Sequence, residues 1–202
     1  MRYDLRHPND PHDGLTTRLL NPDRVYRGSE ALAKPCLVPA SPGVYAWWFR
    51  DTLHVPTQGC VQHDDLTLLY VGISPKAQAP NGRTSRQSLR TRVRYHYRGN
   101  AEGSTLRLTL GCLLGLPLRR VGSGTRRTFA EREAELSQWM EENAFVSWVG
   151  TSEPWLPETE IIATTSLPLN LDQNRSHAFH AELSQLRREA KASAAALPIV
   201  RA

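Results

Sequence analysis

Two strand-length runs of aromatic and β-branched residues constrain the fold of this chain most strongly. The first, GVYAWWF, covers residues 43–49, and the second, TLLYVGI, covers residues 67–73. A Ser-Pro pair precedes the first run and another follows the second, and such pairs interrupt regular structure. The composition of the two runs favours strands over helices. We therefore expect an antiparallel pair, with residues 50–66 as a long excursion between its strands.

Each run also sets a glycine close to a tyrosine, in the strings Gly43-Val-Tyr45 and Tyr70-Val-Gly72. Glycine within a strand allows another backbone or a ligand to approach closely. A strand tyrosine is usually a core residue whose hydroxyl finds a hydrogen-bond partner. Because a phenol has a pKa of about 10, either tyrosine would need a neighbouring cation to act as a general base.

The length of 202 residues fits one domain with additions. Residues 1–36 are rich in Pro, Asp, Asn and Arg and predict an N-terminal arm. Residues 37–175 hold the patterned segments and predict the main domain, and residues 176–202 predict a C-terminal helix and tail packed on it. We expect a cytoplasmic protein without a membrane segment, because no apolar run approaches the roughly 20 residues that a span requires. The three cysteines lack disulfide or zinc spacing, which fits a reducing compartment.

Helical periodicity and capping residues predict helices at 88–97, 104–114, 129–143, 156–165 and 177–196. Residues 145–149 predict a third short strand, and residues 121–127 a flexible turn. The expected fold class is α/β of the α+β kind, with a small mixed or antiparallel three-stranded sheet flanked by helices.

The charges are separated along the chain. Between residues 66 and 101 there is no acidic residue, whereas seven positive charges occur at Lys76, Arg83, Arg86, Arg90, Arg92, Arg94 and Arg98. Residues 128–170 contain eight glutamates and a single arginine. The basic stretch indicates a phosphate-binding surface, on which Lys76 and the arginines other than Arg92 would neutralise flanking phosphates. For Arg86, Arg90, Arg94 and Arg98 a solvated helix face is the alternative, and we expect about two of the four at the nucleic acid. For the acidic stretch, an ordinary solvated helix face is the preferred interpretation.

Arg92 and His96 stand four residues apart on one expected helix, so their side chains share a face. A guanidinium suits the oxygens of a phosphoryl group, which makes Arg92 the candidate for binding a scissile phosphate. Glu158 is the candidate ligand for a hard divalent cation, since such an ion can bind through a single carboxylate. Glu160 is its rival and would point about 200° away on the same helix. Asn170 is either a bridge to loop backbone or a turn residue.

In order and spacing these elements resemble the GIY-YIG nuclease domain. The resemblance rests on Gly-Val-Tyr45, Tyr70-Val-Gly, Leu89-x-x-Arg92 with His96, Glu158-x-x-Ile-Ile and Asn170, and it covers residues 43–170. It implies a small mixed sheet flanked by helices, one divalent metal, Mg²⁺ or Mn²⁺, and hydrolysis of a phosphodiester bond.

The resemblance also implies a role for each motif residue. Tyr45 would be the general base for water and Tyr70 would support it. Arg92 would bind the scissile phosphate, and His96 resembles the histidine that follows one helical turn later in some members. Glu158 would hold the metal, and Asn170 would brace the site.

Three functions remain open from the sequence. A metal-dependent endonuclease acting on nucleic acid, with DNA as the expected substrate, accounts for the whole polar set. A catalytically inactive nucleic-acid binding module of the same fold is the alternative. A domain whose basic helix meets an acidic protein is the third. The 50–66 excursion holds His54, Cys60, His63, Asp64 and Asp65, but without zinc spacing we interpret it as an exposed loop. The oligomeric state and the DNA site or structure recognised are not readable from the sequence.

Overall fold

The run at residues 43–49 is the central strand of the fold in the computed structural model, which describes residues 11–76 and 87–201. This strand, β1 (Gly43–Phe49), pairs antiparallel with β3 (Leu66–Ser74) on one side and β6 (Ala144–Gly150) on the other. A two-residue strand, β2 (Gln62–His63), extends the edge beyond β3. The expected α/β class with a small antiparallel sheet is confirmed, with four strands instead of three.

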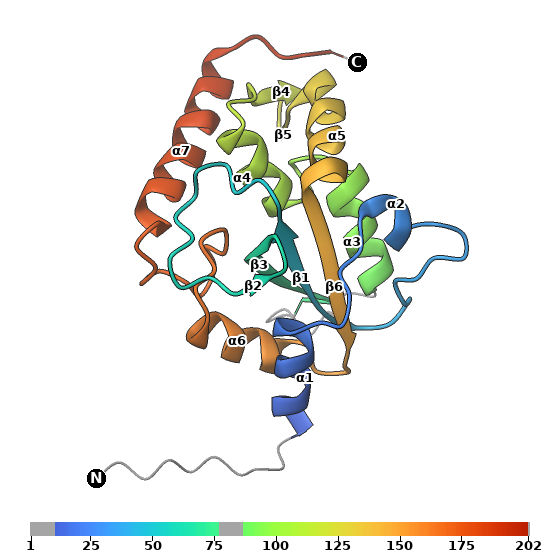
Figure 1. The fold of residues 1–202 in the computed structure, drawn as a ribbon. Helices are drawn as coiled ribbons and strands as arrows, with labels where there is room; N and C mark the ends of the chain where they lie inside the picture. The colour runs from blue at the N-terminus through green and yellow to red at the C-terminus, as the bar shows by residue number, and fades with distance from the viewer. Residues whose placement is uncertain (1–10, 77–86, 202) are drawn as a thin grey trace.

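The sheet is buried on both faces, which explains why β1 reads as a continuous apolar run. Tyr45, Trp47 and Phe49 face one core cluster, and the alternating residues of β1 face another. The first cluster includes residues of α3 (Leu89–Arg98), α4 (Thr105–Leu113), α5 (Glu133–Asn143) and α7 (His180–Ala196). The second includes residues of α1 (Pro11–Leu20) and α6 (Trp155–Thr164). Figure 1 shows α1 and α6 together on one side of the sheet and α4, α5 and α7 on the other.

The expected helices form, and their caps explain their bounds. Ser88 caps α3 by accepting a hydrogen bond from the Thr91 amide, and Ser104 caps α4 in the same way. The third expected helix begins later than its pattern suggests, because a 3₁₀ turn, η1 (Ala130–Arg132), precedes α5. No helix within the described ranges is long and apolar enough to cross a membrane.

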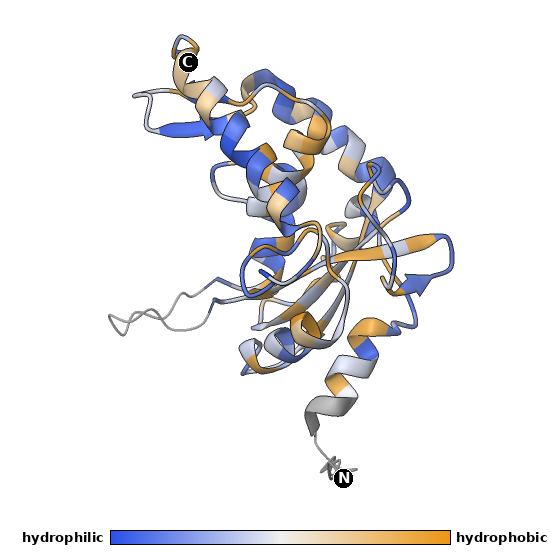
Figure 2. Ribbon diagram, turned by 90° about the vertical axis from the view of Figure 1, so that its left-hand side faces the viewer, coloured by the Kyte–Doolittle hydropathy of each residue, from blue (hydrophilic) through white to orange (hydrophobic). Residues whose placement is uncertain are grey.

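The turn expected at 121–127 is present at residues 122–125, but the two strands that it joins were not expected. This segment belongs to a hairpin of β4 (Arg119–Val121) and β5 (Arg126–Thr128), and Val200 near the C-terminus bridges to Val121 in parallel. Figure 2 shows that this hairpin is hydrophilic, in contrast to the apolar central strands of the main sheet. Hydrophobic alternation is the usual signal for a strand, and a hairpin with two arginines in each strand does not provide it.

The two ends of the chain also contain order that the sequence did not reveal. The N-terminal segment carries α1 and a short helix, α2 (Gly28–Ala31), and Tyr26 bridges to Val146 of the edge strand β6. The 50–66 segment is not entirely a loop, since it supplies β2. These additions surround the sheet and leave one cavity beside β3.

Candidate active site

A cavity of about 510 Å³ lies between β3, α3, α4, α6 and α7. Five of the six residues predicted to be catalytic line it: Tyr45, Tyr70, Arg92, Glu158 and Asn170. The sixth, His96, is fully buried and lies directly behind Tyr45. Residues from five separate parts of the chain therefore meet at one cavity.

Tyr45 is linked by hydrogen bonds to a buried chain of polar groups. Its hydroxyl lies 2.9 Å from Nε2 of His96, and Nδ1 of His96 lies 2.7 Å from the Ser104 hydroxyl. Ser104 also accepts a hydrogen bond from the Arg107 amide as the cap of α4, which fixes its position. The histidine is thus held at both ring nitrogens.

Burial controls the protonation of this pair. Burial raises the pKa of Tyr45 far above its ordinary value, and the neighbouring Tyr70 raises it further, whereas Arg92 acts in the opposite direction. Burial, with the positive charges of Arg92 and Arg107, lowers the pKa of His96 well below its ordinary value. At neutral pH the pair therefore consists of a phenol and a neutral imidazole, and one ring nitrogen of the imidazole is free of a proton and can accept a hydrogen bond.

Arg92 lies beside the Tyr45 hydroxyl and reaches into the cavity. Its Nε donates a long hydrogen bond of 3.4 Å to the Tyr45 oxygen, and Nη1 donates to the Gly103 carbonyl at 2.8 Å. The first contact sets a positive charge next to the phenol, and the second fixes the plane of the guanidinium. Nη2 makes no hydrogen bond to a described residue, so it is available to a ligand in the cavity.

Tyr70 lines the same cavity from β3. Burial raises its pKa, Arg92 and a hydrogen bond with Thr105 at the start of α4 lower it, and the carboxylate of Glu158 raises it. The hydroxyl of Tyr70 is therefore a neutral donor at physiological pH. It lies close enough to the Arg92 guanidinium and the Glu158 carboxylate for both charges to change its pKa.

Glu158 brings a carboxylate into the cavity from α6. Burial raises its pKa to about 7, Lys76 lowers it and Asp172 raises it. Its carboxylate makes no hydrogen bond or ion pair with any residue in the described ranges. A partly desolvated carboxylate without a partner suits a divalent cation, and Asp172 lines the same cavity as a second oxygen donor. Glu160 faces elsewhere, because it accepts a hydrogen bond from Thr16 of α1.

Asn170 braces the strand that carries the second tyrosine. Its Nδ2 donates to the Val71 carbonyl at 2.8 Å, and its Oδ1 accepts from the Val71 amide at 2.9 Å. Both hydrogen bonds fall on the middle residue of the Tyr70-Val-Gly72 string. The side-chain amide of Asn170 thus makes the two backbone hydrogen bonds to Val71 that a neighbouring strand would otherwise make.

Both motif glycines occupy places where a side chain would not fit. A Cβ on Gly43 would lie 2.3 Å from the Val149 carbonyl of β6. A Cβ on Gly72 would lie 2.6 Å from the hydroxyl oxygen of Tyr45, its cross-strand partner. The missing side chain of Gly43 leaves room for the backbone of β6, and that of Gly72 leaves room for the Tyr45 side chain.

The predicted nucleic-acid contacts separate in the structure. Lys76 lines the cavity, and the Nε of Arg90 donates to the Val38 carbonyl at 2.8 Å. Arg94 and Arg98 are exposed on α3. Arg83 and Arg86 lie outside the described residues.

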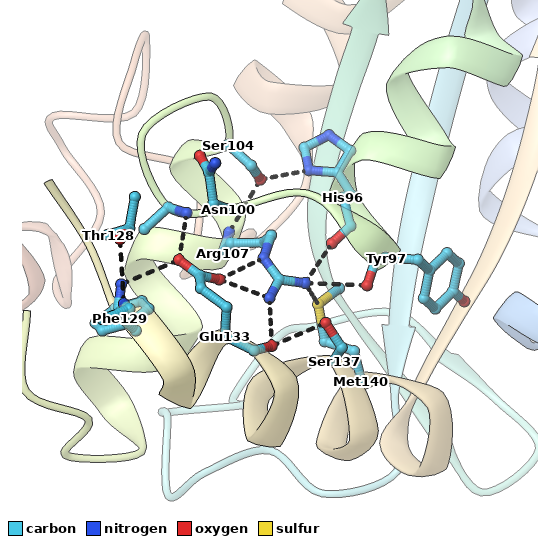
Figure 3. A network of polar contacts seen from close by, with 12 residues as sticks. His96, Tyr97, Asn100, Ser104, Arg107, Thr128, Phe129, Glu133, Ser137 and Met140 are labelled. Carbon is cyan, nitrogen blue, oxygen red and sulfur yellow. Dashed lines mark hydrogen bonds and ion pairs between the residues drawn. The ribbon is translucent and has the colours of Figure 1, made fainter. Parts of the chain in front are cut away.

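Sequence reasoning missed the network that holds His96 in place (Figure 3). The fully buried Arg107 donates to the carbonyls of His96 and Tyr97 at 3.1 and 3.0 Å. It also donates to the Glu133 carboxylate at 2.6 Å and 3.0 Å. The remaining carboxylate oxygen of Glu133 accepts from the amides of Ala101 and Phe129.

This network makes Glu133 an exception to the interpretation of the acidic stretch as a solvated face, whereas Glu131, Glu135 and Glu142 are exposed as expected. Glu133 joins α5 to the end of α3 and the start of α4, the two elements that carry His96 and Ser104. The available signal was Arg107 itself, a charged residue inside the otherwise apolar run of α4.

Two further charged residues that line the cavity were not predicted, Asp172 and Arg187. Asp172 follows the motif asparagine by two residues. Arg187 stands four residues after the fully buried Leu183 and therefore on the buried side of α7. An arginine at a core position of an amphipathic helix was the sequence signal for it.

The polar residues of the 50–66 segment do not form a metal site. Across residues 11–76 and 87–201 there is no group of three or more His, Cys, Asp or Glu side chains placed to hold a metal. His63 packs against Trp48, and Asp65 pairs with Arg50.

Comparison with known proteins assigns the family. The family model of the GIY-YIG catalytic domain matches residues 43–189, which include the strands, the cavity and most of α7. No curated protein and no solved structure matches the chain. The match covers well over half of the sequence, and it contains every motif residue that lines the cavity. The chain belongs to the GIY-YIG family, whose catalytic domain implies nuclease activity.

Proposed function

We propose that the protein is a metal-dependent endonuclease that hydrolyses phosphodiester bonds in DNA. The observation that carries this proposal is the meeting of Tyr45, Arg92 and Glu158 at one cavity, with His96 behind the tyrosine. These groups supply a proton acceptor, a cation for phosphoryl oxygens and a carboxylate for a metal. A binding module would not need all three together.

Tyr45 and His96 would activate the attacking water as a unit. In the tautomer with a proton on Nδ1, His96 donates to Ser104, and its Nε2 accepts the proton of the Tyr45 hydroxyl. The tyrosine oxygen can then take a proton from water while its own proton moves to the imidazole. This relay avoids a resident phenolate, which the burial of Tyr45 opposes. Because burial and the charges of Arg92 and Arg107 also lower the pKa of His96, the imidazolium would form only together with the negative charge that develops on the phosphoryl group.

Arg92 would stabilise the negative charge that develops on the phosphoryl oxygens. Arg92 lines the cavity, its Nε and Nη1 are held by Tyr45 and Gly103, and its Nη2 has no hydrogen bond to a residue that the structure describes. A guanidinium that is already oriented does not have to reorganise during the reaction. It also remains charged under all conditions of interest.

Glu158 would hold the metal, with Asp172 available as a second oxygen donor from the loop after Asn170. A bound Mg²⁺ or Mn²⁺ supplies Lewis-acid stabilisation of the scissile phosphate and the leaving oxygen. Lys76 adds a positive charge at the same wall. The exposed Arg94 and Arg98 would contact flanking phosphates from α3.

A cleavage panel tests the proposal. Purified protein with Mg²⁺ or Mn²⁺ should nick or cut at least one of duplex, flap, junction and single-stranded DNA. Arg92→Ala and Glu158→Gln should abolish cleavage without loss of the fold, whereas Glu160→Gln, two residues along the same helix and outside the cavity, should cleave normally. If wild-type protein leaves every DNA and RNA substrate intact, the enzymatic proposal is wrong. Cutting of RNA alone would overturn the assignment to DNA.

A further inference from the structure

Arg187 brings a guanidinium into the cavity from α7, outside the motif residues that define the family resemblance. It shares the cavity wall with Tyr70 and Asp172. Burial lowers the pKa of Arg187, and Cys112, Asp172 and Tyr70 act in the opposite direction. The side chain is therefore partly removed from water at the edge of the proposed active site.

The guanidinium has no direct partner in the described part of the chain. Arg187 makes no hydrogen bond there and no ion pair with a carboxylate, Asp172 included. Residues 77–86, which the structure does not describe, contain no acidic residue. The buried Arg107 provides the contrast, because carbonyls and the Glu133 carboxylate surround it.

A desolvated cation without a partner lowers stability unless an anion compensates it. Within residues 11–76 and 87–201 none of the Arg187 donors makes a hydrogen bond, whereas two nitrogens of Arg92 donate to Tyr45 and Gly103. A cavity of about 510 Å³ exceeds the space of a single phosphate group, so it accommodates more of a nucleic-acid strand. The two arginines therefore suit different phosphates.

We infer that Arg187 is a positioning residue that binds the phosphate next to the scissile one on the same strand. The inference rests on the proposed nuclease function. Arg92, beside Tyr45, takes the reacting phosphate, and Arg187 takes its neighbour and fixes the register of the strand in the cavity. Its contribution is to binding of the uncleaved strand, in the ground state as much as in the transition state.

Binding without turnover tests this assignment. Anisotropy titration of a fluorescein-labelled DNA duplex with Glu158→Gln protein, at several salt concentrations, gives both the Kd and its salt slope. Adding Arg187→Ala should weaken binding about tenfold and reduce the slope by about one. Arg187→Lys should restore part of the affinity. Arg188→Ala, the exposed neighbour on the same helix, is the matched control and should change neither value by more than about twofold.

Thermal unfolding distinguishes binding from a structural role. If Arg187 serves the ligand, Arg187→Ala removes an uncompensated cation, so the Tm should stay the same or rise. A fall in Tm, unchanged DNA binding, or a loss confined to kcat in the active background would each overturn the inference. Since the titration needs no cleavage, an inactive wild type would defeat the nuclease proposal while leaving the role of Arg187 measurable.

Discussion

The hydroxyl of Tyr45 lies 2.9 Å from Nε2 of His96, and both side chains are almost completely buried. The tyrosine comes from the central strand and the histidine from the last turn of α3. Because burial raises the pKa of the phenol and lowers that of the imidazole, neither group is charged at neutral pH. A proton moved to His96 would form a buried imidazolium beside Arg92 and Arg107, so the transfer depends on the negative charge that develops on the phosphoryl group.

Replacing Tyr45 with Phe should lower the cleavage rate by about 10²–10⁴-fold, because it removes the oxygen that takes the proton from water. DNA affinity should change little, since the phenol is neutral and Arg92, which donates a long hydrogen bond to it, keeps its charge and its contact with the Gly103 carbonyl in the variant. Single-turnover cleavage and anisotropy with the same substrate measure the two effects separately.

Tyr97→Phe is the matched control for this experiment. Tyr97 is also buried, and its hydroxyl donates to the Ala144 carbonyl at 2.8 Å, away from the cavity. Both variants should lose about 1–3 kcal/mol of stability through an unsatisfied partner, but only Tyr45→Phe should lose activity. Equal rates for the two variants would exclude the Tyr45 hydroxyl from the chemistry.

The carboxyl group of Glu158 should make the metal-free protein less stable as the pH rises. Its pKa is 4.5 in the unfolded chain and about 7 in the fold, so the fold binds the proton more tightly. Its stabilising contribution is present below pH 4.5 and is lost between 4.5 and about 7. Above pH 7, Glu158→Gln should therefore be more stable than wild type, by up to about 3 kcal/mol.

Urea unfolding in EDTA at pH 5 and pH 8 measures this difference. Glu160→Gln is the control, and it should not stabilise at pH 8, because its carboxylate accepts a hydrogen bond from Thr16. Saturating Mg²⁺ should remove the difference in the free energy of unfolding between wild type and Glu158→Gln, since the ion binds the carboxylate in the folded protein. A Glu158→Gln protein that is no more stable than wild type at pH 8 without metal would contradict the raised pKa.

Breaking the Arg107–Glu133 pair should be strongly destabilising. The guanidinium is fully buried, so Glu133→Gln leaves an uncompensated charge at a cost of about 3–5 kcal/mol. Arg107→Met should cost a similar amount, and the double variant should cost much less than the sum of the two. Chemical denaturation of wild type, the two single variants and the double variant measures the coupling free energy between the two residues in a double-mutant cycle.

The exposed pair Arg132–Glu135 lies on the adjacent turn and provides the comparison. Its charges remain in water, so removing either residue should change the unfolding midpoint very little. Additive effects of Arg107→Met and Glu133→Gln would mean that the two residues do not stabilise the fold as a pair.

The sequence predicted the parts of the site that follow from local pattern. Strand composition located β1 and β3, and the antiparallel register then placed Tyr45 opposite Gly72. The i, i+4 spacing placed Arg92 and His96 on one side of α3, although only Arg92 reaches the cavity. Local spacing determines on which side of a helix or strand a residue lies. How deeply its side chain is buried depends on the other elements that pack against that side.

The residues that sequence reasoning missed depend on contacts between distant segments. Glu133 looks like one of many glutamates on an amphipathic helix until Arg107, 26 residues away, is placed against it. Arg187 belongs to a helix whose apolar seam was recognised, but nothing in that helix shows that its seam borders a cavity. Charged residues on buried helix positions are the pattern that would have drawn attention to both arginines.

Gly72→Ala should disable the site by moving Tyr45. The added Cβ would lie 2.6 Å from the tyrosine oxygen, which is closer than atoms can approach, and the ring would have to move away from His96. A displacement of about 1 Å in a catalytic group can cost about 100-fold in rate, so cleavage should fall by at least that factor.

Gly14→Ala, where nothing lies within 4 Å of the added atom, is the control and should keep full activity. In a Tyr45→Ala background the new methyl group displaces no ring, so Gly72→Ala should cost less stability there than in wild type. Equal costs in the two backgrounds would show that the strain comes from the strand itself and not from the contact between Gly72 and Tyr45.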